Sequence, residues 1–153
     1  MKRLLLIAAL CTCVVAPVAA ERLKQTEPDP SLSPRDVVRI QMEALRDNDT
    51  PYDNRGIEVT FNFASPANKR LTGPIERFTA MVHHPVYAPM INHRSANFEN
   101  QVIEGELASV DVVLMSEDGE YLGYRFTLSR QRGNSYEGSW MTDGVVPFEV
   151  LSL

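Results

Sequence analysis

The chain has 153 residues, with 20 acidic against 15 basic side chains and a formal net charge of −5 at pH 7. This length suits one domain with a single hydrophobic core better than two domains. The acidic balance opposes nucleic acid and anionic membranes as partners, because both are themselves negatively charged.

The first twenty residues show the order of parts found in a cleavable export signal. Two basic residues precede an apolar run over residues 4–15, and small residues follow up to Ala20. A retained membrane anchor is the alternative, but a spanning helix needs about 20 apolar residues, and Pro17 interrupts this segment. We expect a signal peptide at residues 1–20, no membrane span after its removal, and a periplasmic or secreted protein.

The mature protein is expected to begin at Glu21. Val18 and Ala20 are small enough for the pockets of a signal peptidase, which places the cut after Ala20. Intact-mass measurement of the exported protein checks this expectation, since its mass should be lower by residues 1–20. Recovery of most molecules with these residues attached, from cells with working export, contradicts it.

Removal of the signal also changes the chemistry that remains. Both cysteines, Cys11 and Cys13, lie within it, so the mature chain has no thiol. Disulfides, cysteine nucleophiles and thiolate metal sites are thereby excluded from the mature protein. Loss of Lys2 and Arg3 leaves 13 basic against 20 acidic residues, which strengthens the acidic character.

The mature chain is expected to consist of two parts, a tether and a folded domain. Residues 21–32 are rich in proline and polar side chains and are expected to form an extended, flexible tether. Residues 33–153 are expected to form a single domain. No internal repeat or low-complexity run interrupts it.

The domain opens with a predicted helix. Ser33 is placed to cap it, Pro34 suits its first turn, and Asp36 lies near the positive end of the helix dipole. Val37, Gln41, Ala44 and Leu45 share one face, and the polar segment at residues 47–51 ends the helix.

Two more helices are predicted before residue 85. Residues 57–64 fit a strand by alternation and a helix by spacing; we favour a helix that ends at Ser65-Pro66. A third helix begins after Gly73-Pro74 and carries an apolar stripe. His83-His84-Pro85 ends it.

From Ser95 onward the pattern predicts antiparallel strands. Leu122, Tyr124, Phe126 and Leu128 alternate with smaller or polar residues, as on a sheet with one buried face. A last strand is expected at residues 139–142, with Asp143-Gly144 as a turn. The other predicted turns are at residues 104–105, 117–120 and 132–135.

Helices first and a meander of strands second define an α+β class, with N-terminal helices packed on a curved antiparallel sheet. Four short motifs carry a family resemblance: Phe63-Ala64-Ser65-Pro66-Ala67-Asn68, Thr72-Gly73-Pro74, Arg77-Phe78 and Trp140-Met141-Thr142-Asp143-Gly144-Val145. Residues 33–147 resemble an uncharacterised family, a domain of unknown function, within the nuclear-transport-factor-like and ketosteroid-isomerase-like superfamily. The resemblance implies the cystatin-like cone fold. It implies no activity, because the catalytic acids and histidines of the superfamily's enzymes match no residue here.

Residues 83–94 hold all three histidines together with Tyr87 and Arg94. Adjacent histidines on a helix point about 100° apart, and no Glu-His pair has metalloprotease spacing. We therefore predict no metal and no cofactor.

The predicted ligand contacts are Tyr87, His93 and Arg94 at the mouth of a cone and Trp140 in its wall. In this hypothesis Arg94 binds an anion and His93 tunes binding with pH. The alternative is that Tyr87 and Trp140 only pack and that Arg94 pairs with a surface acid.

No catalytic set is recognisable, so catalytic residues stay unassigned. The sequence favours a non-enzymatic module that binds a small molecule or a protein, a second copy of the chain included. The alternative is a cofactor-free lyase or isomerase that acts inside the cone. An ionisable group with a strongly shifted pKa in a cavity would favour the enzyme.

Overall fold

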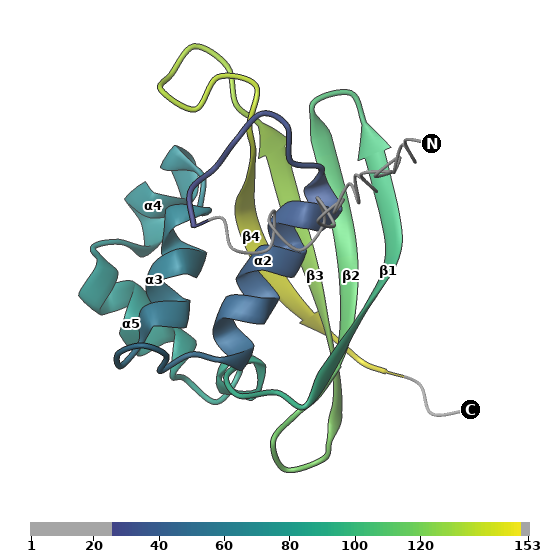
Figure 1. Ribbon diagram of the computed structural model, residues 1–153. Helices are drawn as coiled ribbons and strands as arrows, with labels where there is room; N and C mark the ends of the chain where they lie inside the picture. Colours follow the sequence, from purple (N-terminus) through teal and green to yellow (C-terminus); the bar gives the residue numbers. More distant parts are fainter. Residues whose placement is uncertain (1–25, 151–153) are drawn as a thin grey trace, which may run out of the picture.

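Within residues 26–150, which the computed structural model describes, four α-helices precede four β-strands. Figure 1 shows the helices on one side of an antiparallel sheet, so the α+β prediction is confirmed. The predicted signal and its cleavage site lie outside the described residues. The elements are α2 (Pro34–Arg46), α3 (Arg55–Asn62), α4 (Pro66–Thr72), α5 (Ile75–Val82), a 3-10 turn η1 (Ala88–Met90), β1 (Ser95–Glu104), β2 (Leu107–Met115), β3 (Tyr121–Arg130) and β4 (Trp140–Phe148).

Helix α2 begins as the sequence predicts. The Ser33 hydroxyl accepts a hydrogen bond from the Asp36 backbone N–H, and the Asp36 carboxylate accepts one from the Ser33 N–H. This reciprocal pair satisfies two N–H groups that the first turn leaves unpaired. Val37 and Leu45 on the predicted apolar face are buried, and so is Gln41.

The choice of helix over strand for residues 57–64 is confirmed, since Arg55–Asn62 form α3. The prediction missed the next element. Ser65-Pro66 does not simply end a helix: Ser65 caps α4 by accepting from the Asn68 N–H, and Pro66 occupies its first position. Proline lacks the N–H that a first turn cannot pair, which is why it serves there.

The sheet is a meander in the order β1-β2-β3-β4, with every neighbouring pair antiparallel. The alternation predicted for residues 122–128 is confirmed on β3, and Val110, Val112 and Leu114 of the neighbouring β2 are fully buried. They face the helices together with four residues of β3. Those four are Leu122, Tyr124, Phe126 and Leu128.

The expected turn at Asp143-Gly144 is wrong. Strand β4 continues through these residues, and its register against β3 shifts so that Thr127 pairs with Gly144 while Leu128 pairs with Thr142. Asp143 is thus the extra residue of a bulge. Aspartate and glycine favour both turns and bulges, so the dipeptide alone does not separate the two.

The opposite face of the sheet, here called the outer face, carries an ion pair at its centre. The Arg125 guanidinium contacts both carboxylate oxygens of Asp111, at 2.7 and 2.8 Å. The guanidinium, with help from the Asn100 amide, holds the pKa of Asp111 below its usual range. Asp111 is therefore buried as a paired carboxylate. Tyr121 and Val146 are exposed on the same face.

The segment before α2 also packs on the domain. Leu32, the last residue of the expected tether, is 2% exposed and belongs to the core. The Asn62 amide donates to the Thr26 carbonyl at 3.1 Å. The described part of this segment, residues 26–32, is therefore held against the helices.

Candidate ligand-binding cavity

The site is built where the helices meet the edge of the sheet at β4. The chain between α3 and α4 pairs with Thr142 of β4: the Thr142 N–H donates to Phe63 O, and the Ser65 N–H donates to Thr142 O, both at 2.8 Å. The bulge at Asp143 follows immediately. Beyond this contact, a cavity of about 210 Å³ opens between the helices and the strand.

Apolar side chains make up most of the cavity wall. They come from α2, α4, α5, η1 and the sheet, so the cavity exists only in the folded arrangement of all these elements. Leu71 is 73% exposed, and Thr72 and Met81 are half-buried, so the cavity reaches the surface beside α4 and α5. The apolar lining residues are Leu45, Ala64, Leu71, Phe78, Met81, Val82, Met90, Phe126 and Val145.

One polar group in the wall lacks a complete set of partners. Gln41 is 1% exposed, and its Nε2 donates to Thr142 Oγ1 at 2.8 Å and to Val37 O at 3.2 Å. Its Oε1 accepts no hydrogen bond from the described residues. Among the described side chains, Glu106 Oε2 is the one polar atom that has neither a hydrogen-bond partner nor accessible surface. Gln41 Oε1 also has no partner within residues 26–150, so it must keep some accessible surface.

The other polar side chains of the wall are paired within the protein. Asn68 donates to Thr142 O and accepts from the Thr72 hydroxyl. Thr60 donates to Gly56 O. Gln41 therefore stands out, with its partner Thr142, as a polar group of the wall whose hydrogen bonds are incomplete.

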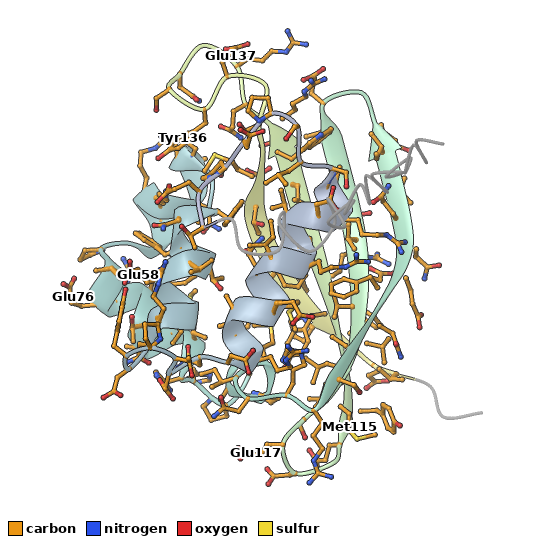
Figure 2. The ribbon with its side chains drawn as sticks, viewed as in Figure 1. Glu58, Glu76, Met115, Glu117, Tyr136 and Glu137 are labelled. Atoms are coloured by element: carbon orange, nitrogen blue, oxygen red, sulfur yellow. The ribbon has the colours of Figure 1, made fainter. Side chains whose placement is uncertain are left out.

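Few charges border the cavity. Asp143 is the one acid among its lining residues, and it accepts a hydrogen bond from the Ser129 hydroxyl at 2.9 Å. Ser129 lies on the outer face, so the Asp143 carboxylate is directed away from the cavity. Figure 2 shows Glu58 of α3 and Glu76 of α5 pointing away from the sheet. No lysine, arginine or histidine of the described residues lines the cavity.

Tyr87 is the predicted site residue that lines this cavity. It is half-buried, and its hydroxyl donates to Val145 O at 3.3 Å. Tyr124 lies close by in the core and donates to Val86 O at 2.9 Å. Burial, with a contribution from Tyr87, raises the pKa of Tyr124 to about 12, so the Tyr124 phenol is a neutral hydrogen-bonding group.

His93 lies outside the lining and is 4% exposed. Its Nδ1 is 2.8 Å from the Met90 carbonyl, so this nitrogen carries the proton and donates. Burial lowers the pKa of the imidazole and keeps it neutral at pH 7. His93 therefore fixes the chain after η1.

Arg94 and Trp140 also lie away from the lining residues. Arg94 is exposed, and its N–H donates to Met115 O at the β2–β3 turn, beside Gly119. Met115 and Glu117 mark this turn at the end of the molecule far from Tyr136 (Figure 2). Trp140 is 8% exposed within the core and pairs with Arg130.

The structure thus does not bring the four predicted residues together. Sequence reasoning did not select Gln41 and Thr142, the hydrogen-bonded polar pair that lines the cavity. A signal for Gln41 was present, since it is a polar residue on the apolar face of the first predicted helix. Its partner lies 101 residues further along the chain, and no local pattern connects the two.

A second hollow of about 230 Å³ lies over the outer face. Exposed Val102, Leu107 and Thr127 border it, and it holds no buried polar group without a partner. Within residues 26–150, no group of three or more metal-ligating side chains is placed to hold an ion. No helix of that part is long and apolar enough to cross a membrane.

These features define an α+β domain with an apolar cavity between its helices and its sheet. Residues 29–151 match the family described as Domain of unknown function (DUF4864), so the chain belongs to that family. The predicted membership of an uncharacterised family is thereby confirmed. No curated protein and no solved structure matches the chain.

Proposed function

We propose that this protein is an exported, non-enzymatic module that binds a small ligand in the cavity beneath α4 and α5. The observation that carries the proposal is the apolar cavity of about 210 Å³ with the buried, incompletely paired Gln41 in its wall. Binding sites for small molecules are concave, mostly apolar and furnished with a few fixed polar groups. The export signal expected at residues 1–20 supports a location in the periplasm or outside the cell.

We also propose that the domain has the cone fold of the nuclear-transport-factor-like superfamily. The support is the order of its elements, with helices followed by a meander sheet, and the cavity between these two layers. Figure 1 shows α2 crossing the sheet while α3, α4 and α5 lie beside β4. The cavity lies on this side, between these helices and residues 142–145 of β4.

Binding is favoured over the alternative of a lyase or isomerase. Such an enzyme needs a general base aimed at its substrate. Asp143, the acid among the lining residues, accepts from Ser129 on the outer face, and the Tyr87 hydroxyl donates to the backbone. Neither is arranged to remove a proton from a ligand.

Toluene is expected to bind in the cavity and to shift the NMR signals of the methionines that line it. Met81 and Met90 line the cavity, whereas Met115 pairs with Tyr121 on the outer face and lies near the β2–β3 turn (Figure 2). In protein labelled with ¹³C at the methionine methyls, saturable shifts should appear at Met81 and Met90 and be absent at Met115. Equal shifts at all three indicate non-specific contact and contradict the proposal.

Val145→Trp is expected to abolish these shifts, because Val145 lines the cavity and an indole fills much of it. Val146→Trp is the matched control, since Val146 is the next residue of β4 and is exposed on the outer face. If the Val145→Trp protein binds toluene as the parent does, toluene does not occupy this cavity, and the proposed binding site is contradicted.

A further inference from the structure

We infer that the ligand of this cavity is a small, neutral molecule that ends in a hydroxyl group. The inference rests on the proposed function and gives its ligand a chemical class. It follows from the hydrogen-bonding groups that the cavity wall leaves open, from the charges that the wall lacks and from the volume that it encloses.

The orientation of the Gln41 amide is set by its partners. The Val37 carbonyl only accepts hydrogen bonds, so the amide atom 3.2 Å from it is the donor Nε2. The oxygen Oε1 must then occupy the other position of the amide. Because Gln41 is buried and lines the cavity, that position offers a fixed acceptor to a ligand.

A donor stands next to this acceptor. Thr142 Oγ1 accepts from Gln41 Nε2, and the hydroxyl proton of Thr142 has no acceptor among the described residues. Thr142 also lines the cavity. One wall therefore offers an acceptor and a donor side by side, and a hydroxyl group satisfies both, because it donates one hydrogen bond and accepts another.

The lining excludes charged ligands. A carboxylate or an ammonium group buried without an opposite charge loses its hydration with no compensation. The lining holds no lysine, arginine or histidine, and Arg94, the predicted anion contact, is exposed beside the β2–β3 turn. The one lining acid, Asp143, is directed to Ser129. A neutral ligand is the one that this wall accommodates.

The volume limits the size of the ligand. Apolar cavities of about 150 Å³ hold benzene, so the cavity of about 210 Å³ holds a molecule with roughly eight heavy atoms. A short-chain alcohol has this size. Its alkyl chain would lie among the apolar side chains from α4, α5 and η1, with the hydroxyl at Gln41 and Thr142.

Two isomers of one formula provide the decisive test. Heptan-1-ol and hexyl methyl ether have the same atoms, but the ether cannot donate a hydrogen bond. The ether is the less hydrated of the two, so apolar partition alone favours it. We expect the wild-type protein to reverse this order and bind the alcohol about three- to tenfold more tightly, as measured by methionine-methyl NMR titration. Heptanoate should bind at least about tenfold more weakly than the alcohol at pH 7.5.

Gln41→Met is expected to remove the preference for the alcohol, since it keeps the volume and deletes the acceptor. Gln131→Met is the control, because Gln131 is also buried but does not line the cavity. Thr142→Val provides a second variant in case Gln41→Met does not fold. It removes the donor that either isomer can accept from, so it should weaken the binding of both isomers and keep the alcohol preferred. Gln41→Met should let the ether bind at least as tightly as the alcohol, while the Gln131→Met control keeps the preference for the alcohol.

The outcomes separate the two proposals. If toluene binds but the ether equals or exceeds the alcohol, the hydroxyl inference is overturned and the proposed function stands. The same holds if heptanoate binds as tightly as the alcohol, or if Gln41→Met retains the preference. If neither toluene nor either isomer shifts Met81 and Met90, both proposals are overturned.

Discussion

Gly56→Ala is expected to lower the melting temperature of the protein by roughly 4–15 °C. Gly56 is buried in α3, where this helix crosses α2. A Cβ atom at this position would lie 2.1 Å from Ala44 O and 2.7 Å from Ala44 C. These are backbone atoms, so relief of the clash requires the two helices to move apart. Overpacking of this kind costs about 1–3 kcal/mol and sometimes more, from a total stability of about 5–15 kcal/mol.

Thermal unfolding followed by circular dichroism measures the effect of Gly56→Ala. The matched control is Gly144→Ala, whose new Cβ would approach Thr127 Oγ1 at 3.6 Å, an ordinary contact distance. We expect the control to unfold within a few degrees of the parent. A Gly56→Ala protein that unfolds as late as the control would show that α2 and α3 separate at little cost.

Local signals were sufficient to predict most of the helices and strands. The capping pattern at Ser33 and the alternation in β3 each concern neighbouring residues, and both predictions are confirmed. The errors arise where one local signal serves two structures. Ser65-Pro66 both follows α3 and begins α4, and Asp143-Gly144 forms a bulge where a turn was expected. Both errors lie next to the place where Thr142 pairs with the α3–α4 connection, a contact that no local pattern reveals.

The candidate site was harder to predict, because tertiary contacts create it. Tyr87, just before η1, lines the cavity. Arg94, only seven residues later, lies instead at the β2–β3 turn, where its N–H donates to Met115 O. Gln41 and Thr142 become a site only when α2 packs against β4. A polar residue on an apolar helix face indicates a buried hydrogen bond. The sequence does not show which residue is its partner, because the partner is brought close only by folding.

Lowering the pH from about 7 to 5 is expected to destabilise the protein through His93. Burial is the main cause of the lowered pKa of His93; Arg46 lowers it further, whereas the Met90 carbonyl, Glu43 and Asp47 raise it. An unfolded histidine has a pKa near 6.5. Between that value and the lower folded value, the unfolded chain binds a proton that the folded chain does not. The contribution of His93 to stability is therefore fully present above about pH 6.5, and it is lost as the pH falls through this window.

The slope of the unfolding free energy against pH measures this contribution, which is at most about 1.4 kcal/mol per pH unit for one proton. Urea unfolding at several pH values between 5 and 7.5 gives the slope. His93→Gln should flatten it, because glutamine does not titrate, although the variant also loses the contact with Met90 O and starts from a lower stability. His84→Gln, which removes an exposed histidine, should retain the parent's slope. If His93→Gln keeps the full slope, the acid sensitivity has another source, and the burial of a neutral imidazole after η1 does not control it.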